Sequence, residues 1–326
     1  MILHKKVLNE LRQQKSVRKG STILIGVSGG IDSIVLAKVM YEIRHALGVR
    51  LYFAHFNHRL RKTSARDEKF VDSFSKKLNI PLIFGRHVHK CSAKKISEDE
   101  ARTWRFEFFT KAMRTSKADL LMLAHNQNDL AETVLMRVIR GTGLHGIRGI
   151  LKAKNIDGIE VLRPLLGTTR NDIELYAEHH HLTHCEDETN KMDIYLRNRI
   201  RRDLIPVLKK DYNPSVVCSL AQLAQSAGDD YSYLQEVTKH RLKENMVKKP
   251  RSVKIKLSFF QDVHIAIARL GLRCVYEELS GDLNKLCFDH VQNACHLAIQ
   301  GKQGSVVHWP NNFKIVKLNR YLECSK

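Results

Sequence analysis

The sequence has no closely spaced cysteines, and this excludes several kinds of site. Its 7 cysteines are scattered along 326 residues, and no C-x-x-C pair occurs. An odd number of scattered cysteines is typical of reduced thiols, so we expect a cytoplasmic protein without a disulfide framework. Zinc ribbons and clustered iron–sulfur ligands find no support, because both need closely spaced cysteines.

Long hydrophobic runs are also absent. No stretch approaches the length of about 18 uninterrupted apolar residues that spans a bilayer. Residues 1–19 are polar and basic, and they contain no apolar core of the kind found in signal peptides. We therefore expect no membrane partner.

Acidic residues are scarce relative to basic ones. The chain has 34 Asp and Glu against 55 Lys and Arg, which gives a formal net charge of +21 and a pI near 9.7. Such an excess suits a polyanionic partner, and nucleic acid is the first candidate. The length favours two domains and allows a sizeable core.

Two common nucleotide-binding motifs are missing. The sequence has neither G-x-x-x-x-G-K-S/T, which passes a lysine to the phosphates, nor G-x-G-x-x-G, which binds dinucleotides. It has instead an apolar run that ends at Val27, followed by two glycines and helix-forming sequence. This pattern predicts a strand, a tight turn and a helix N-terminus that binds phosphate. The residues expected to contact the nucleotide are Ser28, Gly29, Gly30, Ile31, Asp32 and Ser33.

Asp32 places a carboxylate beside the expected phosphates. A carboxylate in this position makes sense if Mg²⁺ lies between it and the phosphate oxygens, so Asp32 is also the candidate metal ligand. The alternative is an ordinary glycine-rich turn with a Ser/Asp helix start. The complete string S-G-G-I-D-S, directly after a strand, favours the nucleotide site.

Hydrophobic patterning predicts alternating strands and helices in the first 140 residues. The fourth strand is almost continuously apolar, as in parallel sheets covered on both faces. We therefore predict an α/β fold with a doubly wound parallel sheet, whose ligand lies at the carboxyl ends of the strands. The expected strands are 22–27, 50–55, 81–84 and 119–124, and the expected helices are 34–47, 64–79, 98–115 and 128–140.

The rest of the chain predicts a linker and a second, smaller domain. Residues 140–158 predict a long glycine-rich loop, and the basic run 243–256 predicts a solvated segment or one near nucleic-acid phosphates. We place an ATP-binding catalytic domain at 1–210, a helical linker at 211–249 and a small α/β domain at 250–326. Beyond 158 the expected helices are 169–181, 214–243, 257–280 and 284–300, and the expected strands are 305–308, 313–316 and 321–324.

A basic loop is expected after the second strand. It holds His55, His58, Arg59 and Arg61, which can bind the oxygens of pyrophosphate or of an RNA backbone. Such a run by itself is more often a solvated loop. Its place at the mouth of the phosphate site makes the two interpretations about equal.

An acidic pair follows the fourth strand. His125 ends the strand, and Asp129 and Glu132 lie three residues apart in the first turns of the next helix, so they share a face. The two carboxylates would hold either Mg²⁺ or an ammonium group. Acidic residues also favour the first turn of a helix through its dipole, so these residues alone leave both interpretations open.

Taken together, these motifs resemble the tRNA(Ile)-lysidine synthases, a branch of the PP-loop ATP pyrophosphatases. Residues 28–33 are similar to that family's nucleotide loop, and residues 54–58 to its A-H-F/V-N/D-H string. The resemblance covers residues 20–206 and then fits a short form with one small C-terminal domain, which would contact tRNA. Further similarities, in the family's order, are 100–106, 125–133, 140–143, 163–166, 186–190 and 197–201.

The resemblance implies a reaction and its substrates. ATP, L-lysine and the wobble cytidine of a tRNA(Ile) with a CAU anticodon would give lysidine, AMP and diphosphate through an adenylated cytidine. ATP with Mg²⁺ would bind residues 28–33 and His55, and Asp129 and Glu132 would hold or deprotonate the lysine amine or bind the metal.

The resemblance also implies roles for basic residues. Arg102, and with it Arg105, would meet a carboxylate or a phosphate, and His125 is a candidate acid or base. The sequence leaves homodimer formation open. The expected tRNA contacts are His58, Arg59, Arg61, Arg140, Arg197, Arg199, Arg201 and Arg202.

Asn126 and Asn128 depart from the family pattern. They stand where many relatives carry His and Asp, which favours Asp129 as the essential acid. The nearest alternative is a PP-loop enzyme that thiolates tRNA, but such enzymes usually use cysteine pairs. A second alternative is a nucleotide-regulated RNA-binding protein without catalysis, and the carboxylates at the phosphate site argue against it.

Overall fold

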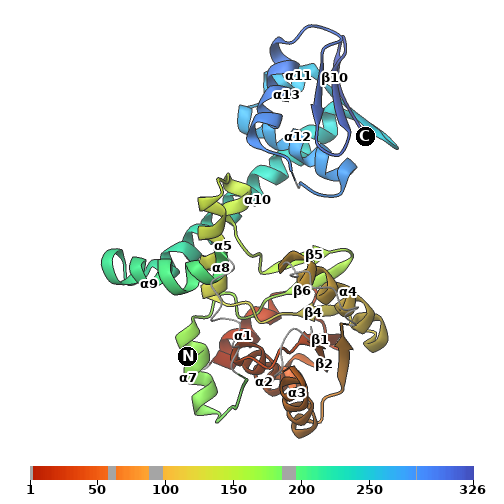
Figure 1. Ribbon diagram of the computed structural model, residues 1–326. Coiled ribbons are helices and arrows are strands. Elements are labelled where there is room, and N and C mark those ends of the chain that lie inside the picture. Colours follow the sequence, from red (N-terminus) through yellow and green to blue (C-terminus); the bar gives the residue numbers. More distant parts are fainter. Residues whose placement is uncertain (1–2, 58–63, 88–97, 186–195, 284) are drawn as a thin grey trace. The chain divides into compact units, whose positions relative to one another are not determined.

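A computed structural model describes residues 3–57, 64–87, 98–185, 196–283 and 285–326 (Figure 1). The chain divides into two compact units, Met1–Gln225 and Ser226–Lys326. Each unit has its own hydrophobic core. Within the described ranges, no helix combines the length and the apolar character needed to cross a membrane.

The first unit contains a 6-stranded sheet in the order β3-β2-β1-β4-β6-β5. Neighbouring strands from β3 to β6 run parallel, and β5 is antiparallel to β6. The prediction of a doubly wound parallel sheet is confirmed, and each predicted strand is present. The strands are β1 (Thr22–Gly26), β2 (Arg50–Asn57), β3 (Leu82–Arg86), β4 (Leu120–Met122), β5 (Ala153–Ile156) and β6 (Ile159–Leu162).

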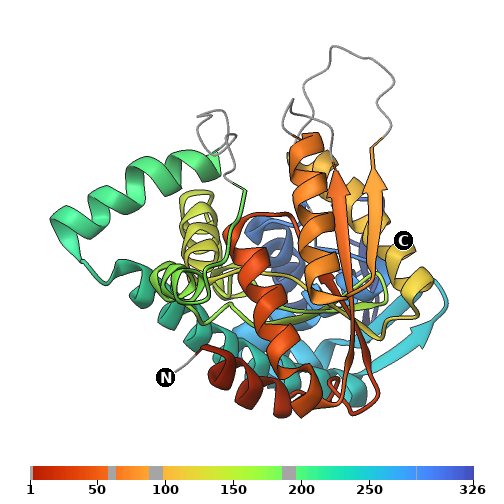
Figure 2. The same cartoon turned by 90° about the horizontal axis from the view of Figure 1, so that it is seen from below.

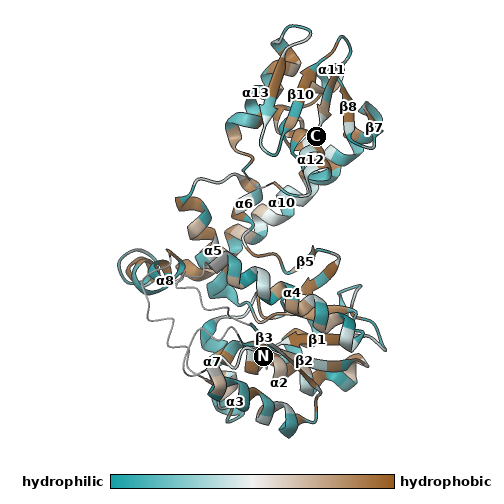
Figure 3. Cartoon of the chain, turned by 45° about the vertical axis from the view of Figure 1, so that its right-hand side comes forward, coloured by the Kyte–Doolittle hydropathy of each residue, from teal (hydrophilic) through white to brown (hydrophobic). Residues whose placement is uncertain are grey.

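Both faces of this sheet are buried. Successive residues of a strand point to opposite faces, so the central strands contribute side chains to two cores. Ile23 and Ile25 of β1 lie in one core together with Phe53 of β2. Leu24 lies in a second core together with Ala54. Figure 3 accordingly colours β1 as hydrophobic. Burial on both sides explains the continuous apolar runs of the central strands.

Helices cover the two faces of the sheet. The first core is covered by α1 (Leu3–Arg12), α2 (Ile31–Leu47), α3 (Ser64–Leu78) and α7 (Arg170–His179). The second core is covered by α4 (Glu98–Ser116), which contributes Phe108 and Phe109. Figure 2 shows α3 and α4 on opposite sides of the strands. Helix α5 (Gln127–Ile139) follows β4 and carries the acidic pair.

The segment 140–158 is more ordered than the predicted loop. It contains the short helix α6 (Leu144–Ile147) and strand β5, which turns back into β6. Asp157 and Gly158 have φ of 50° and 83°, the conformation of a two-residue type I′ hairpin turn. The prediction of a plain loop was wrong here. The Asp-Gly pair signals a hairpin, but the short flanking strands show no strong alternation.

Residues 196–212 form an irregular helical run. Its parts are α8 (Leu196–Arg199), η2 (Ile200–Leu204), α9 (Ile205–Val207) and η3 (Leu208–Tyr212), where η marks a π-helical segment. Ile200 and Ile205 share a buried cluster with Ala131 of α5. This packing brings the basic stretch 197–202 against the helix that carries the acidic pair.

The second unit is a small α/β domain, as predicted. Its antiparallel sheet has the order β7-β8-β11-β10-β9, and Tyr276, Phe259 and Phe313 are fully buried in its core. Helix α10 (Val216–Asn245) begins in the first unit and continues into the second. The other elements are β7 (Met246–Lys249), β8 (Ser252–Lys256), α11 (Leu257–Asp262), α12 (Ile265–Ser280), α13 (Phe288–Gln300), β9 (Val306–Trp309), β10 (Phe313–Lys317) and β11 (Tyr321–Ser325).

Three details of this region differ from the sequence predictions. Residues 246–256 form the β7–β8 hairpin, although we expected a helical linker to 249 and a solvated run. The predicted helix 257–280 is interrupted at Val263, and His264 restarts it by accepting the N–H of Ala266 at 3.2 Å. The two units separate at 225/226, inside α10, rather than at the ends of the linker.

Candidate functional site

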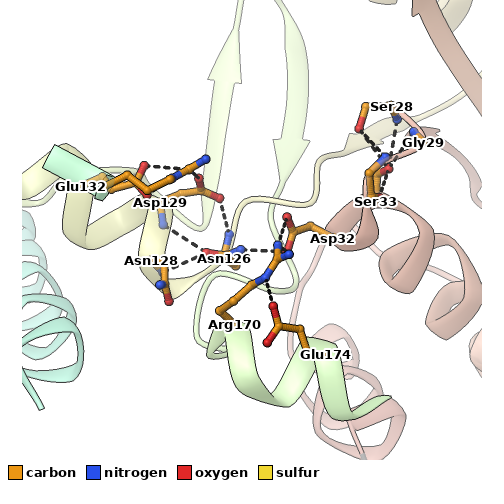
Figure 4. A network of polar contacts seen from close by, with 12 residues as sticks. Ser28, Gly29, Asp32, Ser33, Asn126, Asn128, Asp129, Glu132, Arg170 and Glu174 are labelled. Atoms are coloured by element: carbon orange, nitrogen blue, oxygen red, sulfur yellow. Dashed lines mark hydrogen bonds and ion pairs between the residues drawn. The ribbon is translucent and has the colours of Figure 1, made fainter. Parts of the chain in front are cut away.

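The turn between β1 and α2 is a compact loop stabilised by its own serines (Figure 4). Ser33 Oγ accepts hydrogen bonds from the N–H groups of Ser28 at 3.1 Å and Gly29 at 3.2 Å, and it donates to the carbonyl of Gly30 at 2.8 Å. Gly29 has a φ of 96°, which glycine adopts without strain. Ser33 therefore fixes the loop from inside.

Helix α2 begins without a side-chain cap. Its N-cap is Gly30, whereas α5 and α7 are capped by the side chains of Asn126 and Thr169. The first N–H groups of a helix have no intrahelical partners, and together with the helix dipole they attract anions. The start of α2, at Ile31 and Asp32, therefore fits a phosphate group.

His55 lies beneath this loop. It is 4% exposed, and its Nδ1 lies 2.8 Å from the carbonyl oxygen of Val27. Burial lowers the pKa of His55, so the neutral ring donates Nδ1–H to that carbonyl. This hydrogen bond fastens β2 to the entry of the loop. A direct contact of His55 with the nucleotide stays a prediction.

Asp32, in the first turn of α2, is held by two side chains (Figure 4). Its carboxylate accepts hydrogen bonds from Arg170 Nη1 at 3.0 and 3.1 Å and from Asn126 Nδ2 at 2.9 Å. Burial raises the pKa of Asp32, and the positive charge of Arg170 opposes that rise. The side chain keeps 30% of its surface exposed, so a ligand can reach the carboxylate.

Asn126 joins Asp32 to the acidic helix. Its side-chain oxygen caps α5 by accepting the N–H groups of Asn128 at 2.9 Å and Asp129 at 3.1 Å. In return, Asp129 Oδ2 accepts the N–H of Asn126 at 2.9 Å. One buried amide thus connects the carboxylate of the phosphate loop to the start of α5.

Asp129 and Glu132 share one face of α5, as expected, and both are paired with arginines. Arg197 donates to Glu132 at 2.9 Å and to Asp129 at 3.1 Å. Arg201 donates to Glu132 at 2.5 and 2.9 Å and to Asp129 at 3.1 Å. Glu132 is 1% exposed, so two guanidinium groups compensate a carboxylate that has little access to water. Arg197 and Arg201, which the sequence assigned to tRNA, are thus engaged with the acidic pair.

His125 interacts electrostatically with Asp129 and with several arginines. Burial is the main reason why the pKa of His125 falls to about 3; Asp129 opposes this fall, and Arg163 and Arg105 add to it. The ring is therefore neutral at pH 7. A ring that resists protonation is a poor general acid and a weak general base at neutral pH, so the role of His125 as an acid or base stays a prediction.

Arg163, whose charge acts on His125, and Arg102, whose charge acts on Arg163, have different environments. Arg163, directly after β6, is buried and donates from Nη1 to the carbonyl of Leu151 at 2.7 Å. Burial lowers the pKa of Arg163 to about 10, and the charge of Arg102 adds to this effect. Arg102 is exposed on α4, and its guanidinium lies 5.4 Å from the ring of Phe106. Arg102 therefore remains accessible to an anion.

The other predicted tRNA contacts fall into two groups. Arg140, Arg199 and Arg202 are exposed to solvent, and their contact with tRNA stays a prediction. His58, Arg59 and Arg61 lie outside the described residues, as does the family string at 186–190.

Sequence reasoning missed Asn126 and Arg170 as partners of Asp32. An Asn three residues before an Asp at a helix start signals a capping box, so the local role of Asn126 could have been found. The start of α7 at Arg170 was also predictable from Thr169. Its contact with Asp32 was not, because the two residues are 138 positions apart and only tertiary packing brings them together.

The described residues contain no group of three or more side chains that could hold a metal ion. Magnesium that arrives with a nucleotide needs fewer, because phosphate oxygens and waters supply most of its ligands. Asp32 offers one partly exposed carboxylate beside the uncapped start of α2. These residues fit a nucleotide-bound Mg²⁺ held by Asp32.

The site lies where the strand order reverses. In the sheet, β2 lies on one side of β1 and β4 on the other. The connections after β1 and β4 diverge at such a point, and open α/β sheets bind their ligands in the resulting crevice. The phosphate loop follows β1, and residues 125–132 follow β4.

The comparisons with known proteins agree with this arrangement. A family described as the PP-loop domain matches residues 3–208. The tRNA(Ile)-lysidine synthase of Clostridium perfringens is 34% identical over 98% of this chain and 67% of that protein. The enzyme of the same name from Clostridioides difficile is 32% identical over 96% of this chain and 68% of that protein. The chain therefore belongs to the PP-loop proteins and, among them, to the tRNA(Ile)-lysidine synthase family.

A solved structure supports the fold independently. The U34-tRNA thiolase NcsA from Methanococcus maripaludis, solved with its 4Fe–4S cluster, matches with a TM-score of 0.58 and 18% identity. The match covers 69% of this chain and 76% of that one. At this identity the likeness shows a common fold and nothing about the reaction.

Proposed function

We propose that this chain ligates L-lysine to C2 of the wobble cytidine of a CAU-anticodon tRNA(Ile), using ATP and releasing AMP and diphosphate. The observation that carries this proposal is the chain of contacts from Asp32 through Asn126 to Asp129. It joins an anion-binding loop to an acidic pair at one edge of the sheet. A reaction that joins an activated nucleobase to an amine needs these two sites side by side.

The phosphate loop serves the first step. Cytidine O2 attacks the α-phosphorus of ATP, the bond to the β-phosphate breaks, and diphosphate leaves from an adenylated base. The N–H groups at the uncapped start of α2 would bind the phosphates. Mg²⁺ held by Asp32 would neutralise charge on the diphosphate. Asn126 keeps the Asp32 carboxylate in place during this step.

The acidic pair serves the second step. The ε-amine of lysine attacks C2, the C2–O2 bond breaks, and AMP leaves with that oxygen. Asp129 and Glu132 would orient the amine and accept its proton. Arg197 and Arg201 lie against both carboxylates. The two arginines would hold both carboxylates in place for this contact.

The basic surface would bind the tRNA. The net charge of +21 favours a polyanion. We assign Arg140, Arg199 and Arg202 of the first unit to this contact because all three are exposed. We assign the second unit to the same partner.

Among the described cysteines all are free, which supports the predicted cytoplasmic setting.

The thiolation alternative is not favoured. The curated relatives that match nearly the whole chain are named tRNA(Ile)-lysidine synthases. The sequence has no C-x-x-C pair to hold a cluster. A binding protein without catalysis has no use for the buried acidic pair beside the phosphate loop.

One incubation tests the proposal. The protein is mixed with ATP, radiolabelled lysine and a CAU-anticodon transcript, and the RNA is digested to nucleosides. We expect a lysine-labelled nucleoside and one AMP per label. A transcript with U in place of the wobble C is the control. Release of AMP without label in the RNA, or label in the control transcript, would refute the proposed reaction.

A further inference from the structure

We propose that Arg170 changes partners when nucleotide binds: it holds Asp32 in the free protein and binds the phosphate chain of ATP in the complex. This inference rests on the proposed function, because it requires ATP at residues 28–33. It adds a substrate-binding residue that lies outside the motifs of the sequence resemblance.

Arg170 extends from the start of α7 to Asp32 of the phosphate loop (Figure 4). Its Nη1 donates to both oxygens of Asp32, and its Nε donates to Glu174 Oε1 at 2.7 Å. No described residue accepts a hydrogen bond from its Nη2. The side chain is 40% exposed. Arg170 thus contacts the phosphate loop through Asp32, and its Nη2 group can still donate hydrogen bonds to a ligand.

A nucleotide with its metal would compete with Arg170 for Asp32. The carboxylate of Asp32 is the group that fits Mg²⁺, and Arg170 contacts both of its oxygens. Two cations at the same oxygens repel each other strongly in a partly buried site. Asn126 contacts one oxygen and carries no charge, so it is compatible with a metal ligand. Binding therefore displaces Arg170 and leaves Asn126 in place.

The displaced guanidinium would take the phosphate oxygens of the nucleotide as its new partner. Glu174, one turn further along α7, still binds its Nε and keeps the side chain at the site. The planar donors of arginine match phosphate oxygens in pairs. Arg170 would then stabilise the charge that develops on the departing diphosphate.

A double-mutant cycle separates this role from simple charge balance. Binding of inorganic pyrophosphate is measured by calorimetry in EDTA for wild type, Asp32→Asn, Arg170→Gln and the double variant. In Asp32→Asn there is no carboxylate charge to balance. If Arg170 contacts phosphate, adding Arg170→Gln to Asp32→Asn weakens pyrophosphate binding by about tenfold or more. Equal affinity of Asp32→Asn and the double variant would reduce Arg170 to a counter-ion of Asp32.

Two further variants control for the surface and for folding. Glu178→Gln removes an exposed carboxylate one turn further along α7 that has no part in the proposed contact, so we expect its affinity to stay within about twofold of wild type. Arg170→Lys keeps the charge without the planar donors, and we expect an intermediate loss. It also tests the contact if Arg170→Gln unfolds. Affinity of Arg170→Lys equal to wild type would contradict the paired contact. If the wild-type protein bound neither ATP nor pyrophosphate, the proposed function itself would be overturned.

Discussion

Glu132 depends on its neighbours because it is a carboxylate almost without contact with water. Arg197 and Arg201 supply its ion pairs. We expect the double variant Arg197→Ala/Arg201→Ala to lose about 3–5 kcal/mol of unfolding free energy, since the buried charge is left uncompensated. Urea denaturation measures this loss.

Two variants check the cause of that loss. Arg199→Ala removes an exposed arginine of the same segment and should change stability by less than about 0.5 kcal/mol. Adding Glu132→Gln to the double variant removes the buried charge and should restore part of the stability. An unchanged urea midpoint in Arg197→Ala/Arg201→Ala would mean that the pairs do not stabilise the fold.

His125 makes the stability of the protein depend on pH. Its pKa is about 3 in the folded state, whereas an exposed histidine has an ordinary pKa of 6.5. As pH falls below 6.5 the unfolded chain takes up a proton that the folded chain does not, so stability falls. The contribution at pH 5 is on the order of 2 kcal/mol. We expect His125→Asn to lose less stability than wild type between pH 7 and pH 5, measured by urea denaturation. Parallel pH profiles would contradict a buried neutral histidine.

At the scale of elements, Asn126 combines two functions that substitutions can separate. Asn126→Ser keeps a good N-cap for α5 but loses the amide that binds Asp32, whereas Asn126→Ala loses both. We expect the alanine variant to be about 1 kcal/mol less stable than the serine variant. Both should form AMP slowly, because Asp32 loses its neutral donor. Full AMP formation by Asn126→Ser would show that the amide contact has no role in the reaction.

The strongly patterned elements could be predicted from the sequence. The strands of the parallel sheet and the loop 28–33 carry local signals, namely apolar runs and glycines before a helix. The β5–β6 and β7–β8 hairpins were missed because their outer strands, 153–156 and 246–249, have four residues each and are mostly exposed, so they carry no strong apolar pattern.

Within the site, the shared face of Asp129 and Glu132 was predictable from their spacing. The arginines that pair with the site carboxylates were not, since Arg197 is 65 positions from Glu132. Charge in a basic run indicates a partner but does not identify it. Only the packing of 196–212 on α5 turns these side chains inward.

At the scale of the whole molecule, the excess of basic residues sets how RNA binding responds to salt. Contacts between arginine or lysine and phosphates release counter-ions, so affinity falls as salt rises. With about six such contacts, tRNA affinity should fall by about 10³-fold between about 50 and 200 mM salt. Filter binding with a CAU-anticodon transcript measures the slope. A nearly flat dependence would show that the charge of +21 is not used to bind RNA.

The bare start of α2, where Gly30 offers no side chain, has a consequence for the lifetime of the protein in a cell. A nucleotide that binds there binds only the folded protein, so it shifts the folding equilibrium toward the folded state. A nucleotide present at one hundred times its dissociation constant raises the free energy of unfolding by about 2.7 kcal/mol. Proteases cleave unfolded chains. We therefore expect the protein to be degraded more slowly in a cell with abundant nucleotide than in a cell depleted of nucleotide.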